Sequence, residues 1–135
     1  MAKYKFGKTS KKNLNEAHPL LQEIFNEVIQ IFNCSVIEGH RTEAEQNKAY
    51  ERKQSKLKYP KSKHNKVPSL AVDVIPYPVD WKDTNRFCLL AGVVKGIAHS
   101  KDIKIRWGGD WNGNNYCTDE HFLDMPHFEL VGVRK

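Results

Sequence analysis

The sequence predicts a small α+β domain in which helices pack against an antiparallel or mixed sheet. Its 135 residues suit one domain, which we expect to span residues 1–135. Segments with helical periodicity lie between short strand-like segments, so the strands of the sheet are not neighbours in the sequence. No internal repeat, low-complexity segment or Gly/Ser-rich linker divides the chain.

The first predicted helix lies within residues 14–32. Its apolar residues recur at helical spacing and would form one buried stripe. They are Leu14, Ala17, Leu21, Ile24, Phe25, Val28 and Phe32. Because proline fits a helix only in its first turn, we expect the regular helix to begin near Pro19. Residues 35–39 follow as a short strand.

A second helix is predicted to begin after Thr42. Thr42 and Glu45 have the spacing of a capping box, and the helix is expected to reach about Ser55. The Lys- and Pro-rich stretch 56–68 is typical of a loop. Residues 70–75 (LAVDVI) then favour a strand, which the following Pro-Tyr-Pro ends.

The last third of the chain predicts one long helix and two strands. Asp80 is expected to cap a helix over residues 81–99, with Trp81 among its inward residues. Apolar and basic residues alternate over 103–107, which indicates a half-buried strand. A Gly- and Asn-rich loop follows, and residues 127–131 (HFELV) form the final strand.

The composition excludes several protein classes. With 39% hydrophobic and 28% charged residues, the chain is expected to be globular and soluble. Its longest apolar run, Leu89–Val94, is too short to span a membrane. Three widely spaced cysteines, Cys34, Cys88 and Cys117, favour reduced thiols over a disulfide framework. The basic N-terminus has no apolar stretch behind it, so we expect no signal peptide and a cytoplasmic location before any release.

The chain is basic. Lysines and arginines exceed acidic residues by 22 − 16 = 6, and much of the excess lies in residues 3–12 and 52–66. This charge predicts attraction to a polyanion, such as a nucleic acid, an anionic lipid or an acidic cell-wall polymer. Tyr59 is the single aromatic residue of the second stretch, which makes that stretch a poor platform for stacking bases.

Polar residues inside apolar strands indicate a site. Asp73 lies within LAVDVI, His127 opens HFELV, and His64 precedes the Asp73 strand. A buried carboxylate is costly unless it is paired, hydrogen-bonded or bound to a metal. Two imidazoles and one carboxylate would leave a fourth zinc position open for water, and Asp124 lies where it can reach that water. Spacing alone is a weak indication, and by itself it favours a structural role, with Asp73 as a loop cap and His127 as a core histidine.

Ordered motifs along nearly the whole chain carry a resemblance to a known family. They are KFGKTS near the start, EGHRT at 38–42, SKH at 62–64, AVD at 71–73, RWGGDW at 106–111, the DxxH pair at 124–127 and HFEL at 127–130. The pattern resembles the zinc D-Ala-D-Ala carboxypeptidase/L-alanyl-D-glutamate endopeptidase family, and most closely its phage endolysins. The resemblance implies a hedgehog/DD-peptidase-like fold.

The resemblance also implies a role for each matching residue. His64, Asp73 and His127 would bind Zn²⁺, and Asp124 would act as the general base. Arg41 would steady the substrate carbonyl and the developing oxyanion.

Two further residues of the site are less sharply assigned. Ser62 would orient the substrate or support a ligand. Glu129 alternates with His127 on one strand face and competes with Asp124 as the base, although the DxxH spacing favours Asp124. The segment 65–72 is longer than in the commoner family pattern and lacks its glycine, so we expect it to bulge outward while the register at Asp73 survives.

The resemblance implies a peptidoglycan peptidase that cuts the stem peptide, with L-alanyl-D-glutamate as the favoured bond. Such an enzyme would act as a monomer without obligatory nucleic acid, and its release would depend on a separate holin. A D-Ala-D-Ala carboxypeptidase is the nearest alternative. An Fe(II) oxygenase shares the donor set, but His64 and Asp73 lie far apart among helices. A basic nucleic-acid-binding module, with an incidental His/Asp cluster, is the non-enzymatic alternative.

Overall fold

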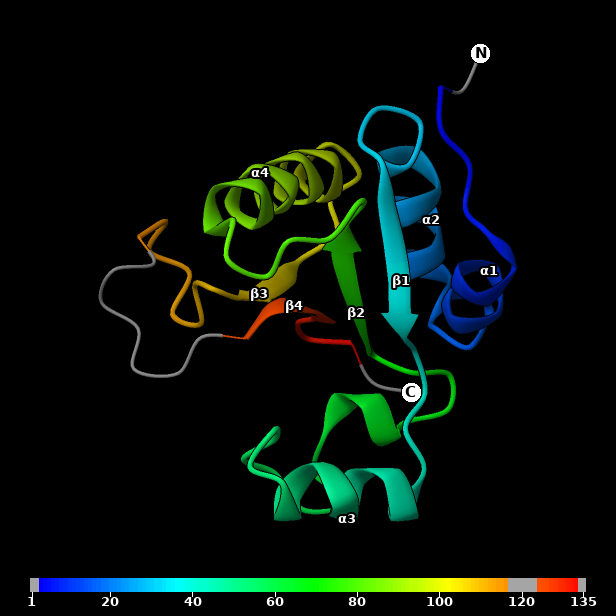
Figure 1. The fold of residues 1–135 in the computed structure, drawn as a ribbon, viewed down its shortest axis with the longest axis vertical. Coiled ribbons are helices and arrows are strands. Elements are labelled where there is room, and N and C mark those ends of the chain that lie inside the picture. Colours follow the sequence, from blue (N-terminus) through cyan, green and yellow to red (C-terminus); the bar gives the residue numbers. More distant parts are fainter. Residues whose placement is uncertain (1–2, 117–123, 134–135) are drawn as a thin grey trace.

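A four-stranded antiparallel sheet organises the chain, as the computed structural model of residues 3–116 and 124–133 shows (Figure 1). The spatial order of the strands is β1-β2-β4-β3. The strands are β1 (Cys34–Glu38), β2 (Ala71–Pro76), β3 (Ile105–Gly108) and β4 (Asp124–Leu130). The helices are α1 (Lys8–Asn15), α2 (Pro19–Val28), α3 (Glu43–Glu51) and α4 (Thr84–Ser100), with a short 3₁₀ turn η1 (Lys63–Asn65). The predicted α+β class and the predicted antiparallel sheet are confirmed.

The core lies between the sheet and the helices α2 and α4. The apolar face of α2 is fully buried, and the Phe25 ring meets Phe128 of β4 edge to face at 5.5 Å. On β2, Val72 and Val74 point into this core. Because side chains alternate along a strand, Asp73 points to the opposite face of the sheet. Polar side chains such as Asp73 can therefore gather on the face of the sheet that does not pack against the core.

The apolar stripe of residues 14–32 is divided between two helices. The prediction that a regular helix begins near Pro19 is confirmed, since Pro19 occupies the first turn of α2. The prediction of one continuous stripe is wrong, because α1 ends at Asn15. Between the helices, the chain pairs with Ser69, whose carbonyl accepts from the His18 amide at 2.8 Å. This long-range pairing draws the backbone out of helical geometry.

The predicted capping box is present at the start of α3. The Thr42 side chain accepts from the Glu45 amide at 3.2 Å, and the Glu45 carboxylate accepts from the Thr42 amide at 2.8 Å. Each bond satisfies an amide that a helix start leaves without a partner. The helix ends at Glu51, one turn earlier than predicted.

The predicted start of α4 is wrong. Asp83 caps the helix by accepting from the Arg86 amide, whereas Asp80 accepts from the Lys82 amide in the preceding turn. Trp81 consequently lies outside the helix and is 56% exposed, although it stacks on Phe87. Asp80 and Asp83 both suit a cap, and the preceding turn decides between them.

The strand β4 begins at Asp124, three residues earlier than predicted. Gly108 of β3 lies opposite Asp124 at an irregularity in the pairing. A Cβ atom at Gly108 would lie 2.0 Å from the Asp124 carbonyl oxygen, so only glycine allows this close approach. The loop before β2 bulges outward as predicted, with Val67 60% exposed and the pairing of Asp73 with His127 intact.

Two of the three cysteines, Cys34 and Cys88, lie in described residues, and Cys34 is a buried free thiol. Burial raises the pKa of Cys34 to about 12, so this thiol stays protonated and inert. Cys117 lies outside the described residues. Among the helices in described residues, none combines the length and the apolar character needed to cross a bilayer.

Candidate metal centre

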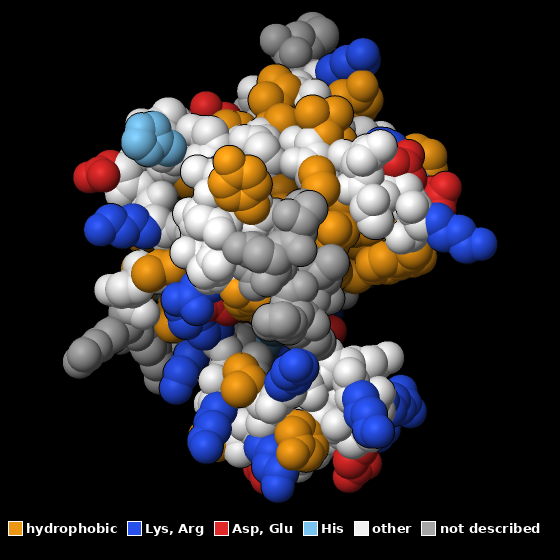
Figure 2. Space-filling view, turned by 90° about the vertical axis from the view of Figure 1, so that its left-hand side faces the viewer, with side chains coloured by type: hydrophobic (Ala, Val, Ile, Leu, Met, Phe, Trp, Pro, Cys, Tyr) orange, Lys and Arg blue, Asp and Glu red, His pale blue; other side chains and the backbone are white. Residues whose placement is uncertain are grey.

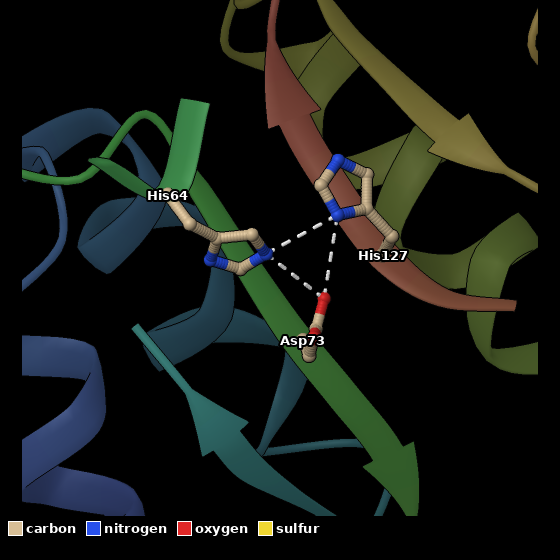
Figure 3. Close-up of side chains that lie close together, drawn as sticks. All are labelled: His64, Asp73 and His127. Carbon is tan, nitrogen blue, oxygen red and sulfur yellow. Dashed lines mark hydrogen bonds and ion pairs between the residues drawn. The ribbon is translucent and has the colours of Figure 1, made fainter. Parts of the chain in front are cut away.

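His64, Asp73 and His127 converge on the polar face of the sheet (Figure 3). Asp73 on β2 pairs in register with His127 on β4, and η1 brings His64 over both. His64 Nε2 lies 3.2 Å from Asp73 Oδ1 and 3.3 Å from His127 Nδ1. The third distance, from His127 Nδ1 to Asp73 Oδ1, is 3.3 Å. The three residues singled out in the sequence therefore present three donor atoms to one point.

The spacing of these atoms fits a tetrahedral metal ion. Ligand atoms about 2.0–2.1 Å from a zinc ion, at the corners of a tetrahedron, lie about 3.3 Å from one another. The three measured distances are 3.2, 3.3 and 3.3 Å. Two imidazoles and one carboxylate are a donor set that zinc accepts, with a fourth corner left for water or substrate.

Hydrogen bonds on the outer nitrogens orient both imidazoles. His64 Nδ1 lies 2.7 Å from the carbonyl oxygen of Gly39, and His127 Nε2 lies 2.8 Å from Glu129 Oε1. Each of these nitrogens must carry the hydrogen, since its partner can only accept. The opposite nitrogens face the shared centre, and once deprotonated they direct their lone pairs toward it, as metal-binding histidines do.

The charges around this centre favour a cation. Burial opposes ionisation of Asp73, but His64 and His127 outweigh it and hold the pKa of this carboxyl well below its usual range. Burial would lower the pKa of His127, but its hydrogen bonds to Asp73 and Glu129 raise that pKa to about 9. The first shift keeps Asp73 ionised, and the second shows that the nearby carboxylates favour a positive charge, which a divalent metal would supply.

Asp124 lies beside the three donor atoms without joining them. Its Oδ2 atom is 4.0 Å from His127 Nδ1, and its side chain is half-buried. Burial, followed by repulsion from Asp73, raises the pKa of Asp124 to about 6. A carboxyl group with such a pKa can take up and release a proton near neutral pH.

Glu129 occupies a different position from Asp124. Its carboxylate accepts from His127 Nε2 on the side of the ring that faces away from the donor cluster. Lys63 Nζ lies 3.2 Å from its other oxygen. Burial opposes ionisation, but His127 and Lys63 outweigh it and lower the pKa of Glu129. Glu129 therefore orients the His127 ring.

Arg41 reaches the centre from the loop between β1 and α3. Its Nη2 atom lies 3.8 Å from Asp73 Oδ2, the oxygen that is not part of the cluster. Its Nε atom pairs with Glu38, and Nη1 donates to the Gln46 side chain at 2.8 Å. The sequence did not indicate Gln46, because one buried glutamine in a polar helix leaves no pattern. These contacts hold the guanidinium in a fixed position beside Asp73.

Ser62 acts through the backbone of η1. Its hydroxyl accepts from the His64 amide at 3.2 Å, while the Asn65 side chain accepts from the Ser62 amide at 3.1 Å. Asn65, which the sequence did not indicate, also donates to the Arg41 carbonyl at 3.0 Å. These bonds shape the turn that presents His64 to the centre.

Comparison with known proteins agrees with this geometry. The sequence matches the family described as phage L-alanyl-D-glutamate peptidase over residues 1–131. The chain belongs to this family. This family member is 32% identical over 137 residues to the L-alanyl-D-glutamate peptidase of Escherichia phage T5, covering 95% of this chain and 98% of that protein. The crystal structure of the Serratia marcescens L-Ala D-Glu endopeptidase ChiX matches with a TM-score of 0.74 and 27% identity, over 96% of this chain and 92% of that one. The predicted family is thus confirmed.

Two hollows border the centre in this phage L-alanyl-D-glutamate peptidase family member. One is a cavity of about 310 Å³ that contacts His64, His127 and Asp124, with the Trp111 ring 5.4 Å from the His127 ring. The other lies across Asp124 and contacts Asp73 and the exposed Trp81. Arg41 and Asp124 line both hollows. A chain laid across the centre can therefore occupy space on both sides of it.

Basic side chains surround the first cavity. Figure 2 shows Lys and Arg side chains gathered over the lower part of the face it views, around α3 and the segment that follows it. The exposed basic residues of this segment are Arg52, Lys53, Lys56, Lys58, Lys61 and Lys66. The basic stretch 52–66 that the sequence singled out thus borders the candidate site.

Proposed function

We propose that this protein is a zinc peptidase that hydrolyses the L-alanyl-D-glutamate bond of the peptidoglycan stem peptide. The observation that carries the proposal is the triangle of His64, Asp73 and His127 donor atoms at tetrahedral spacing, with Asp124 beside it. Membership of the phage L-alanyl-D-glutamate peptidase family supports the bond assignment. Both named relatives carry that activity in their names, which favours it over the D-Ala-D-Ala carboxypeptidase alternative.

Three side chains would hold the metal. His64 and His127 would bind through the nitrogens that face the centre, and Asp73 through Oδ1. When bound, zinc lowers the pKa of a coordinated water to about 7 and polarises a carbonyl group. Asp73 Oδ2 faces Arg41, which favours binding of the carboxylate through one oxygen.

Asp124 is the general base in this proposal. Its carboxylate accepts a proton from the attacking water and returns that proton to the amine nitrogen as the peptide bond breaks. The proposal is supported by its position beside the three donor atoms, with Oδ2 4.0 Å from His127 Nδ1, and by a pKa raised to about 6, which suits both transfers. Glu129 is less suited because its carboxylate is engaged by His127 and Lys63.

Arg41 stabilises the negative charge that develops on the carbonyl oxygen. A guanidinium keeps its charge at every relevant pH and can donate to two oxygens at once. Its contacts with Glu38 and Gln46 orient it before the substrate arrives, so little reorganisation accompanies the reaction.

The wider setting follows from the proposed activity. We propose that residues 1–135 form one peptidase domain that works as a monomer on peptidoglycan. The protein would stay in the host cytoplasm until a separate holin gives it access to the wall. Its basic surface around the cavity would attract an acidic wall substrate.

Mass spectrometry of purified peptidoglycan fragments, incubated with zinc-loaded protein, tests the activity. We expect new fragments that begin with the amine of D-glutamate. Asp124→Asn serves as the inactive control, and Asp102→Asn, an exposed aspartate in a turn, as the matched active control. Loss of only a terminal D-alanine would replace the endopeptidase assignment with a carboxypeptidase. No cleavage by folded, zinc-bound protein would overturn the proposal.

A further inference from the structure

Arg106 lies at the edge of the candidate metal centre, and its positive charge has no role in the proposed hydrolysis. It lies on β3 directly across from Glu129 on β4, so both side chains project from the same face of the sheet as His127. Its side chain is 42% exposed and lines the cavity of about 310 Å³. Arg106 also opens the RWGGDW motif that the sequence singled out.

Glu129 does not fully neutralise the charge of Arg106 or occupy its hydrogen-bond donors. Arg106 Nε lies 4.0 Å from Glu129 Oε2, the outer limit of an ion pair, and an exposed pair of this kind contributes little. Glu129 is already engaged by His127 at 2.8 Å and by Lys63 at 3.2 Å. Within residues 3–116 and 124–133, the Arg106 guanidinium makes no hydrogen bond. Its donors are therefore available to a ligand in the cavity.

The two hollows beside the centre differ in charge. The Arg106 cavity contains four lysines or arginines in addition to Arg41, counted over the described residues, against the carboxylates of Asp124 and Glu129. The four are Lys56, Lys61, Lys63 and Arg106. In the other hollow, the described residues include four acidic side chains against three basic ones. The cleft therefore has one end that favours an anion.

The proposed substrate has an anion at one end of the bond that is cut. Glutamate carries two carboxyl groups, and a peptide chain continues through only one of them. The other carboxylate stays free, a few bonds from the nitrogen that leaves on hydrolysis. The alanyl side of the same bond carries no charge. The charged glutamyl side of the bond therefore matches the basic cavity, and the uncharged alanyl side matches the other hollow.

We propose that Arg106, with Lys61 lining the same cavity, binds the free carboxylate of the D-glutamyl residue. This inference rests on the proposed function and names the residue that determines its specificity. The D-glutamyl side of the bond lies in the basic cavity, and the L-alanyl side lies in the hollow that contains Trp81. A guanidinium suits this role because its planar donors match the two oxygens of a carboxylate.

Two synthetic substrates test the assignment. Both contain the L-alanyl-D-glutamyl bond, and in one the free carboxylate is converted to a primary amide. For the wild type we expect kcat/KM to be at least about 10-fold higher on the carboxylate substrate. Arg106→Gln should lower kcat/KM on that substrate by about 10- to 100-fold, leave the amide substrate nearly unchanged, and so remove the preference. Arg106→Lys should retain part of it.

Lys104→Gln is the matched control, because it removes one positive charge from an exposed residue outside the cavity. It should leave kcat/KM on both substrates unchanged. An equal loss on both substrates in Arg106→Gln would overturn the proposal, because it would indicate a structural role. Equal cleavage of both substrates by the wild type would overturn it while leaving the peptidase activity intact.

Titration with the product separates this inference from the proposed function. The probe is the D-glutamyl peptide released by the reaction, and its binding to wild type and Arg106→Gln is measured by calorimetry. We expect at least about 10-fold weaker binding to Arg106→Gln. If the wild type cleaves neither substrate, the proposed function fails, and this titration alone decides the role of Arg106. Equal binding to both proteins would then overturn the proposal.

Discussion

His127 and Glu129 are joined by a hydrogen bond of 2.8 Å between the imidazole Nε2 and the carboxylate Oε1. The two residues are neighbours on one face of β4, separated by a single core residue, Phe128. The bond fixes which nitrogen of His127 carries hydrogen, and therefore which nitrogen faces Asp73. One short strand thus supplies a proposed ligand, His127, and the carboxylate that orients it.

Replacing Glu129 should weaken metal binding without abolishing it. In Glu129→Gln, the His127 ring loses its charged acceptor, so we expect zinc affinity to fall by about 10- to 100-fold. Competition with a fluorescent zinc chelator measures the change. Glu23→Gln, at an exposed position on α2, is the matched control. Unchanged affinity in Glu129→Gln would show that the hydrogen bond does not set the metal site.

Asp124→Asn should separate catalysis from binding. The variant keeps all three ligands, so we expect full zinc stoichiometry, while kcat should fall by about 100- to 10,000-fold because the proton acceptor is gone. Zinc content by mass spectrometry and steady-state hydrolysis of a stem-peptide substrate test both parts. Activity close to that of the wild type would move the base to another residue, with Glu129 the first to examine.

The stability of the zinc-free protein should decrease as the pH rises above neutrality. Burial opposes a charge on His127, yet Asp73 and Glu129 raise its pKa from 6.5 to about 9. A pKa raised by folding stabilises the folded chain fully below pH 6.5, and this stabilisation is lost as the pH rises through about 9.

We therefore expect the Tm of chelator-treated protein to fall between pH 6.5 and 9. Zinc competes with the same proton, so zinc binding at pH 7.5 should release protons and the Tm of the loaded protein should vary less. Thermal scans and calorimetry in buffers of different ionisation enthalpy measure both effects. A rising Tm for the zinc-free protein over this range would contradict the role of His127.

Gly108→Ala should displace Asp124, the proposed base, through a backbone clash that does not involve the Asp124 carboxylate. A Cβ atom there would lie 2.0 Å from the Asp124 carbonyl oxygen, so β4 must shift where Asp124 begins it. We expect a lower kcat and a lower Tm. Gly92→Ala in α4 is the matched control, because no atom lies within 4 Å of its added Cβ and alanine favours a helix by about 1 kcal/mol. Equal behaviour of the two variants would exclude the steric argument.

Local patterns predicted much of the fold and of the site. The capping box at Thr42 depends on residues within one turn, and it is present as expected. Asp73 was found because a carboxylate inside an apolar strand is unusual, and His127 because it opens one. The polar sheet face then brings these two residues together through the antiparallel register of β2 and β4.

The features that the sequence did not predict depend on partners far along the chain. The break between α1 and α2 depends on hydrogen bonds to Ser69, which no local pattern reveals. Gln46 and Asn65 resemble ordinary polar residues until the fold places them against Arg41. The DxxH spacing already favoured Asp124 as the proposed base, but the contacts of the Glu129 carboxylate with Lys63 and His127 are seen only in the folded chain.

The three donor residues come from segments that differ in how firmly hydrogen bonds fix them to the rest of the fold. Asp73 and His127 belong to paired strands, whereas His64 belongs to a single turn, joined to its surroundings by bonds such as the one from the Arg41 amide to the His64 carbonyl at 2.8 Å. A metal ion would therefore cross-link the η1 turn to the sheet. Hydrogen exchange should show faster amide exchange at residues 62–65 after chelation, with little change in β2 and β4. Zinc would then stabilise one wall of the cleft in addition to its proposed role in hydrolysis.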